Sequence, residues 1–268
     1  MVAKVLCLAL ALFCAVSADN RIVGGTPVSI QEFPSVVAVV YHYPRPDIYI
    51  QRCAGAVISS WHVLTTAFCF TGATLTNAYL RGGSSESLSG GQLTGIRQMI
   101  QHPDYDATTR FSDIAVVVTS QPFVLSGSMN ILYIPPANTY LPDGLQTRVA
   151  GWGFETEEGP QHDSLKAITL TTVNLEQCKK AYEDVEDIDI KDSVICAANE
   201  NAGTCFGDSG APMIYNNVII GISSYYKDCG NSAYPDVFTK VDSFTDWIME
   251  TAVAPTGETP LRSASIYY

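Results

Sequence analysis

Short apolar or alternating runs recur every ten to twenty residues along most of this chain, with clusters of Gly, Pro, Asn or Asp between them. Runs this short, bounded by turn residues, are typical of β-strands rather than helices. The pattern predicts strands over Val36–Val40, Ala54–Ile58, Ile96–Ile100, Ile114–Val118, Thr147–Ala150, Ala167–Val173, Pro212–Tyr215, Val218–Ser223 and Val237–Val241. The Asn216-Asn217 pair between two of these runs predicts a hairpin turn. We therefore expect an all-β fold.

Two short helices interrupt the strand pattern. Asn174 is a good N-cap for a helix that continues to Tyr182. Ser243 is the expected cap of a second helix, in which Phe244, Trp247, Ile248 and Thr251 share one face.

Two further segments carry no strand or helix pattern. Residues 183–192 hold six acids and one lysine and predict a solvated loop, with a contact surface as the alternative. Residues 254–268 are rich in Pro, Thr and Ser and predict a flexible C-terminal tail.

The N-terminus has the pattern of a targeting segment. Lys4 precedes an apolar run, and Val16-Ser17-Ala18 is a small-residue cleavage site. We expect a signal peptide over 1–18, with a core helix as the alternative reading.

Six cysteines follow the predicted cleavage site: Cys53, Cys69, Cys178, Cys196, Cys205 and Cys229. An even count in a secreted chain indicates three disulfides, although the count alone leaves the pairing open. A zinc site is disfavoured because no Cys-x-x-Cys pair occurs and only His62 lies near a cysteine.

The composition and net charge of the chain limit which classes of partner it is expected to bind. The 268 residues are 47% apolar, which supplies ample core material, and they include 27 acids against 15 bases, for a net charge of −12. Nucleic acid is excluded as an expected partner, because phosphate binding needs clustered cations. Beyond the N-terminus no run of about 18 apolar residues occurs, so no membrane span is expected. The acidic balance fits a soluble secreted protein with neutral or basic partners.

The segment that points to chemistry follows Cys205. Gly207-Asp208-Ser209-Gly210 presents a serine in a Gly-flanked turn, where the N–H groups of Gly207 and Ser209 can converge as an oxyanion hole. Such a sequence is also ordinary turn chemistry. Its significance comes from four companions in the chain: Arg21-Ile22-Val23-Gly24-Gly25, Ala67-Phe68-Cys69, Asp113-Ile114-Ala115 and Gly151-Trp152-Gly153.

In order and spacing, this set resembles the chymotrypsin/trypsin family of secreted serine proteases over residues 22–253. The resemblance implies two six-stranded antiparallel β barrels, a cleft between them and a C-terminal helix. It pairs Cys53 with Cys69, Cys178 with Cys196, and Cys205 with Cys229. No metal or cofactor is expected, since the loop that binds calcium in some relatives offers only Glu86 here.

The same resemblance implies activation by cleavage. A cut after Arg21 would remove residues 19–21 as a propeptide and free the ammonium of Ile22, which pairs with Asp208 in the family. A buried ion pair is tolerated only when both charges are matched, so the uncut chain should leave Asp208 unpaired.

The expected catalytic triad is broken. Ser209 and Asp113 match the nucleophile and the orienting acid, but Phe68 stands where the family has its base. A benzyl ring accepts no proton, so the serine stays weakly nucleophilic. The chain's histidines are expected to be surface or packing residues rather than a relocated base: His42, His62, His102 and His162. Burial without an imidazole partner should raise the pKa of Asp113, despite a hydroxyl contact from Ser224.

The specificity pocket also departs from trypsin. By resemblance, Gly203 forms its floor and Asp236 its opposite wall, as in the broad-specificity collagenolytic branch; a solvent-facing Asp236 is the alternative. Tyr226 replaces a glycine at the pocket mouth and is expected to act as a lid.

The sequence therefore favours a secreted, non-catalytic serine protease homologue. It would act as a decoy, cofactor or regulator of proteolysis, binding protein or peptide ligands or other proteases. The alternatives are a serine endopeptidase with weak or substrate-assisted hydrolysis, and a structural or storage role. The acidic 183–192 segment, which the resemblance places beside the substrate groove, favours a basic partner.

Overall fold

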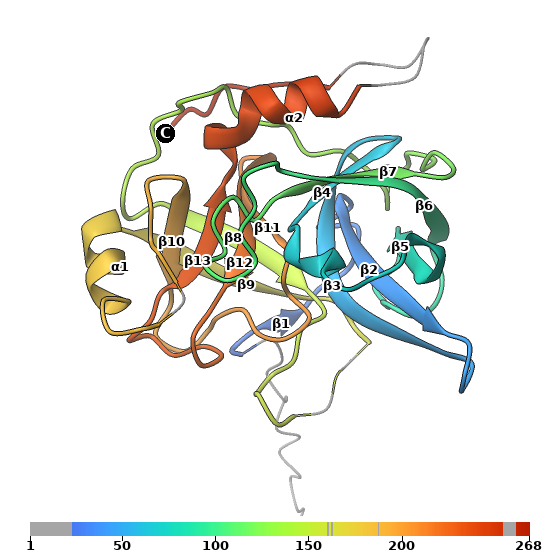
Figure 1. Cartoon of the computed structure of the whole chain (residues 1–268), viewed down its shortest axis with the longest axis horizontal. Coiled ribbons are helices and arrows are strands. Elements are labelled where there is room, and N and C mark those ends of the chain that lie inside the picture. The colour runs from blue at the N-terminus through green and yellow to red at the C-terminus, as the bar shows by residue number, and fades with distance from the viewer. Residues whose placement is uncertain (1–22, 160, 162, 187, 254–260) are drawn as a thin grey trace, which may run out of the picture.

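Two antiparallel β barrels lie side by side in this computed structural model, which describes residues 23–159, 161, 163–186, 188–253 and 261–268. The predicted signal peptide and propeptide, Arg21, Ile22, His162 and residues 254–260 lie outside the described residues. Figure 1 shows the N-terminal barrel in blue to green and the C-terminal barrel in yellow to red.

The first barrel closes in the order β2-β3-β4-β7-β6-β5. Its strands are β2 (Val36–Tyr43), β3 (Ile48–Ser59), β4 (His62–Thr65), β5 (Ala78–Gly82), β6 (Gln92–Gln101) and β7 (Ala115–Thr119). Buried aliphatic side chains fill its interior, among them Val39, Val63, Leu80 and Val117.

The second barrel follows the order β8-β9-β10-β13-β12-β11 and closes through the pairing of β11 with β8. Its strands are β8 (Gln146–Gly151), β9 (Lys166–Val173), β10 (Val194–Ala198), β11 (Pro212–Tyr215), β12 (Val218–Tyr225) and β13 (Asp236–Lys240). The short β1 (Thr26–Pro27) pairs with β9 outside this ring. The expected two six-stranded barrels are thus confirmed.

The Asn216-Asn217 turn joins β11 to β12 as predicted. Both residues are left-handed, with φ of 48° and 63°, and Tyr215 pairs directly with Val218. Two successive positive φ values are the requirement of a type I′ hairpin, and asparagine tolerates them better than most residues do.

Both predicted helices exist, but only one is capped as predicted. In α1 (Leu175–Ala181), the side chain of Asn174 accepts hydrogen bonds from the N–H groups of Glu176 and Gln177. The Ser243 cap of α2 (Thr245–Thr251) is wrong. A 3-10 turn over Val241–Phe244 precedes α2, so Ser243 lies inside the helical segment and Phe244 takes the cap position.

A third apolar cluster joins the two barrels to α2, which crosses the top of the view in Figure 1. Leu64 of the first barrel, Ile219 and Ile222 of the second, and Phe244 and Ile248 all belong to it. Burying side chains of this size contributes roughly 1.5–3 kcal/mol each, which fixes the barrels relative to each other.

Three disulfides form between Cys53 and Cys69, Cys178 and Cys196, and Cys205 and Cys229, the pairing that the resemblance implies. They close loops of 16, 18 and 24 residues. In the chain-entropy model each such bridge stabilises the fold by about 3 kcal/mol.

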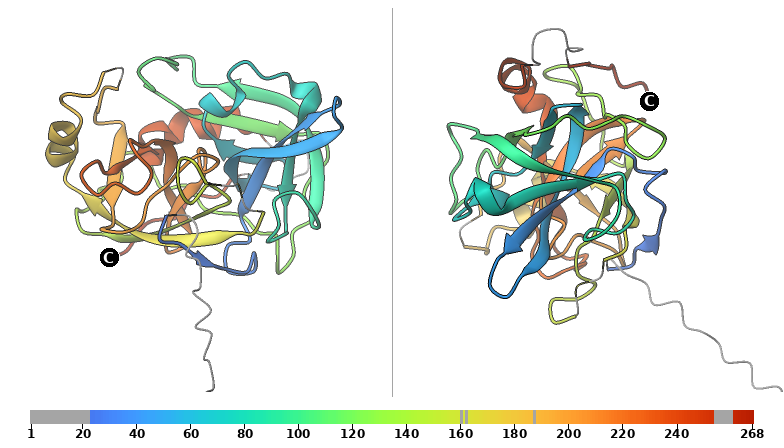
Figure 2. Two further views of the ribbon diagram at one scale, coloured as in Figure 1. Left: turned by 90° about the horizontal axis from the view of Figure 1, so that it is seen from below. Right: turned by 90° about the vertical axis from the view of Figure 1, so that its right-hand side faces the viewer.

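The end of the chain differs from the predicted flexible tail. Ser263 forms a parallel bridge with Ile134, and the N–H of Ala264 donates to the Ile134 carbonyl at 3.1 Å. Leu261 and Ile266 pack on two of the apolar clusters. These apolar residues, hidden in a Pro/Thr/Ser-rich segment, explain why residues 261–268 lie along the body of the protein. Both views of Figure 2 show this end beside the barrels.

Within the described residues, no helix has the length and apolar character needed to cross a lipid bilayer.

Candidate active site

A cleft of about 900 Å³ lies between the barrels. Phe68 and Cys53 line it from the first barrel, and Gly207, Ser209 and Ser224 line it from the second. The structure thus brings together residues that lie more than 150 positions apart in the chain, as the sequence motifs required.

Glycines shape the turn that carries Ser209. Gly207 and Gly210 have φ of 95° and 86°. A Cβ on Gly210 would lie 2.1 Å from the carbonyl oxygen of Ala54, so no other residue fits there. Ser209 is anchored to the first barrel, because its carbonyl accepts the Ala54 N–H at 2.8 Å.

The donors around Ser209 are unused. Among the described residues, neither the N–H of Gly207 nor that of Ser209 has a hydrogen-bond acceptor, and the Ser209 hydroxyl has no partner. The Gly207 carbonyl accepts the Gln51 side-chain amide at 2.8 Å. This bond holds the peptide that follows Gly207 and leaves donors on the cleft side of the turn.

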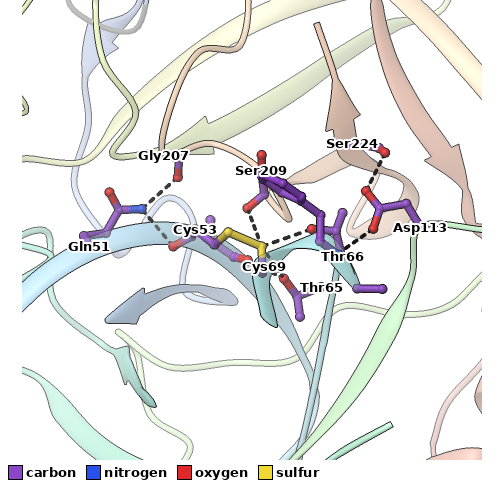
Figure 3. The surroundings of a disulfide bond; sticks show 12 residues. Gln51, Cys53, Thr65, Thr66, Cys69, Asp113, Gly207, Ser209 and Ser224 are labelled. Carbon is purple, nitrogen blue, oxygen red and sulfur yellow. Dashed lines mark hydrogen bonds between the residues drawn. A yellow bond between two sulfur atoms is a disulfide. The ribbon is translucent and has the colours of Figure 1, made fainter. Parts of the chain in front are cut away.

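Asp113 is completely buried two residues before β7. Its carboxylate accepts the Ser224 hydroxyl at 2.7 Å and the Phe68 N–H at 2.8 Å. Figure 3 shows Asp113 and Ser224 beside the Cys53–Cys69 disulfide and Ser209. Burial raises the pKa of Asp113, and these hydrogen bonds only partly oppose the rise.

Phe68 opens a 3-10 turn, Phe68–Phe70, at the cleft wall. Its side chain is 39% exposed, unusual for a phenylalanine in the interior of a cleft. The ring carries no proton donor or acceptor, although its backbone N–H bonds to Asp113.

Arg110 is a cleft residue that the sequence reasoning missed. Its guanidinium carbon lies 3.4 Å from the centre of the Phe68 ring, and Nη1 lies 3.6 Å from a carboxylate oxygen of Asp113. A positive charge therefore covers the Phe68 ring. The sequence signal was an arginine three residues before Asp113.

Among the described residues that line the cleft, which exclude His162, there is no histidine. His62 is buried and bonds to the Ser59 hydroxyl at 2.7 Å, and burial lowers its pKa. His102 packs edge-on against Phe244 and Trp247, and burial lowers its pKa as well. His42 lies near the end of β2 and bonds to Asp47 at 2.6 Å.

Asp208 is buried behind the serine turn. Its carboxylate accepts N–H groups of Gly153 at 2.8 Å and Cys205 at 3.1 Å, and burial raises its pKa to about 7. A Cβ on Gly151 or Gly153 would lie 2.3 or 2.1 Å from a carboxylate oxygen of Asp208. The Gly151-Trp152-Gly153 motif thus has a physical reason: both glycines make room for this carboxylate.

Asp236 faces the interior rather than solvent, since it is only 5% exposed. It accepts the Thr204 N–H at 2.6 Å, and burial raises its pKa to about 7. A Cβ on Gly203 would lie 3.2 Å from its carboxylate, so the two residues are neighbours as expected.

Two aromatic rings line the cleft near this buried acid. Phe206 and Tyr226 meet edge to face with centroids 5.7 Å apart, and both belong to the described lining of the cleft, whereas Gly203 and Asp236 do not. Burial raises the pKa of Tyr226, and the carboxylates of Asp208 and Asp236 raise it further. The Tyr226 phenol therefore lies near the buried acids.

The acidic segment borders a second hollow of about 780 Å³ rather than the cleft itself. Lys191 lies over the Phe111 ring at 4.3 Å and pairs with Asp189 at 3.1 Å, so part of the segment's charge is neutralised internally. No described residues form a cluster of three or more His, Cys, Asp or Glu side chains that could hold a metal ion.

Comparisons with known proteins agree with this geometry. The family model described as Trypsin matches residues 22–248. The chain is 31% identical to trypsin, alkaline B, of Manduca sexta, over 91% of this chain and 96% of that protein. It is 32% identical to trypsin CFT-1 of Choristoneura fumiferana, over 87% and 92% of the two chains. With its two barrels, three disulfides and Gly-Asp-Ser-Gly turn in the interbarrel cleft, this chain belongs to the trypsin family of serine proteases.

Proposed function

We propose that this protein is a secreted, non-catalytic member of the trypsin family that acts by binding protein or peptide ligands. The observation that carries the proposal is Phe68 in the position where the resemblance places the general base, with no histidine among the described residues that line the cleft. Without a base, Ser209 keeps its proton and remains a weak nucleophile. A decoy, cofactor or regulator of other proteases needs the shape of the cleft but no turnover.

Fluorophosphonate labelling tests this proposal. The chain cleaved after Arg21 is exposed to the probe and assayed with a mixed panel of peptide substrates, beside Ser209→Ala and a catalytic trypsin. We expect no label and no hydrolysis above the Ser209→Ala level. Label on Ser209, or turnover that Ser209→Ala abolishes, would contradict it.

Weak endopeptidase activity is the second candidate. It is supported by the retained Ser209 and Asp113, by unused N–H donors beside Ser209, and by relatives named as trypsins. A substrate histidine beside the scissile bond could supply the missing base. Comparing matched His and Gln peptides on Phe68→Gly, which enlarges the vacated space, tests this assistance; equal rates would exclude it.

We also propose that the chain retains the activation switch, with a signal peptide over 1–18, a propeptide over 19–21 and a protease domain over 22–253. Val23 supports this, because its carbonyl accepts the Gly203 N–H at 3.2 Å beside the loop of Asp208. An ammonium on Ile22, one residue earlier, would neutralise that buried carboxylate. Hydrogen exchange of residues 203–210 should slow after cleavage at Arg21; unchanged exchange would argue against the switch.

Secretion is part of the same proposal. Three disulfides persist in oxidising compartments, and the apolar N-terminus is of signal-peptide length. N-terminal sequencing of protein collected from the medium of expressing cells checks the predicted cut after Ala18.

A further inference from the structure

The guanidinium of Arg110 lies in the cleft and donates no hydrogen bond to any described residue. An arginine carries five N–H donors in a rigid plane. Within the described part of the chain, none of them makes a hydrogen bond, and Nη1 is buried without a partner. Nη1 faces Asp113, whereas Nε and Nη2 are neither buried nor bonded to a described residue, so they are the donors left for an acceptor in the cleft.

Asp113 does not fill that role. Its oxygens already accept the Ser224 hydroxyl and the Phe68 N–H at 2.7 and 2.8 Å, whereas Nη1 of Arg110 stays 3.6 Å away. That separation is beyond hydrogen-bond distance. Asp113 therefore attracts one edge of the guanidinium without satisfying it.

The backbone of Arg110 is held in an unusual conformation. Its φ is 57°, in the left-handed region that is costly for residues other than glycine. Residues in such conformations cluster at ligand sites, where surrounding structure holds them. The Phe68 ring, 3.4 Å below the guanidinium carbon, fixes the plane from which its donors project.

The rest of the cleft is also rich in donors. Described N–H groups of Gly207 and Ser209 and the Ser209 hydroxyl are unused. Three cations line the cleft, Arg52, Arg110 and Lys227, against two acids, Glu157 and Asp228, on a chain whose overall charge is −12. The cleft is thus locally suited to an anion, unlike the rest of the protein.

We propose that Arg110 makes this cleft a receptor for a carboxylate-bearing peptide, with the carboxylate paired to the guanidinium and the chain resting on the aromatic walls. A planar carboxylate matches the planar guanidinium and accepts two parallel hydrogen bonds. The inference rests on the proposed binding function and names its ligand chemistry. The carboxylate belongs either to an Asp or Glu side chain or to a peptide C-terminus.

Fluorescence polarisation with labelled hexapeptides tests the inference. In one set, each peptide amide carries a single Glu at one of the six positions in an Ala/Phe background, with a Gln peptide as its counterpart. In the other set, Gln peptides end in a free acid or an amide. The full chain is tested as wild type, Arg110→Gln, Arg110→Lys and Arg148→Gln. Arg148 is the matched control, because it stacks on Phe33 at 4.3 Å and pairs with Glu32 at 3.5 Å outside the cleft.

We expect at least one Glu or free-acid peptide to bind about tenfold or more tightly than its neutral counterpart. That ratio should fall to about one in Arg110→Gln, decrease partly in Arg110→Lys and stay unchanged in Arg148→Gln. A Glu preference identifies a side-chain carboxylate, and a free-acid preference identifies a peptide C-terminus.

Equal affinity for charged and neutral peptides in wild type, or no binding by any peptide at 1 mM, would overturn the inference. So would a carboxylate preference that survives in Arg110→Gln. Chromatography of the recovered peptides separates the two proposals, since cleavage products would refute the non-catalytic function whatever the binding ratio.

Discussion

The Phe68→His variant should regain part of the peptide hydrolysis rate of a complete catalytic triad, and we expect the charge of Arg110 to limit the size of that gain. The new imidazole would stand over Asp113, already bonded to the backbone N–H at position 68 at 2.8 Å. A general base becomes an imidazolium in the transition state. The guanidinium that now lies 3.4 Å from the ring centre would repel that charge.

The penalty follows from Coulomb's law. Two unit charges 3.4 Å apart repel by about 5 kcal/mol at an effective dielectric constant of about 20, and by about 2.4 kcal/mol at about 40, a value suited to an open cleft. Each 1.36 kcal/mol is about a factor of ten in rate, so Arg110 costs roughly 10²–10⁴. Losing a triad member costs about 10⁶ in comparable hydrolases. Phe68→His alone should therefore recover about 10²–10⁴ in kcat/KM, and adding Arg110→Gln should recover a further factor of about 10²–10⁴.

Fluorogenic peptide amides report the recovery in protein cleaved after Arg21. Ala precedes the scissile bond in these substrates, so that the result does not depend on the space beside Phe206 and Tyr226, which both line the cleft. Phe68→His combined with Ser209→Ala controls for contaminating protease. A single variant as active as the double variant would refute the charge argument, and so would silence of both variants.

Three further predictions concern stability. The first is that Asp236→Asn becomes more stable relative to wild type, by at least about 1 kcal/mol, as pH rises from 4 to 8. The pKa of Asp236 is about 7 in the folded protein, above its unfolded value, so protonated Asp236 stabilises the wild-type fold fully below pH 4 and this stabilisation is lost as pH rises through 7. Denaturant melts across that range check this, and parallel curves would contradict it. Gly153→Ala should destabilise by about 1–3 kcal/mol, because its Cβ would lie 2.1 Å from the Asp208 carboxylate. Gly127→Ala is the matched control, since Gly127 likewise lacks a positive φ but has open space around the added Cβ. Removing residues 261–268 should cost about 2 kcal/mol or more and lower the urea midpoint, through lost backbone bonds and apolar burial; an unchanged midpoint would mean that this segment contributes nothing.

The strands that could be predicted were short apolar or alternating runs bounded by turn residues, and all nine predicted runs coincide with strands to within a few residues. The missed strands carry a weaker pattern: β1 has two residues, β4 has four and begins with a histidine, β5 includes Arg81 and Gly82, and β10 ends in two alanines. Their pairing comes from barrel closure, a long-range constraint that no local window contains.

The sequence motifs indicated which residues lie near one another. Ser209 and Phe68, picked out by sequence order, both line the cleft, and Asp113 is buried beside it with its carboxylate bonded to the Phe68 N–H. Arg110 could not be picked out in this way, because its importance depends on a left-handed φ and on a ring that happens to lie beneath it. The Ser243 cap failed for a similar reason: the preceding 3-10 turn moved the start of α2 beyond it.

The contact between Phe206 and Tyr226 has a consequence for ligands that carry a long basic side chain. Such a side chain needs an open path if it is to pair with a buried acid. Asp236 is only 5% exposed and is not among the described residues that line the cleft, whereas Phe206 and Tyr226 line it with centroids 5.7 Å apart. We therefore expect a lysine or arginine side chain to gain no ion pair with Asp236, so a ligand of that kind would dissociate from this cleft faster than from one with an open acidic pocket.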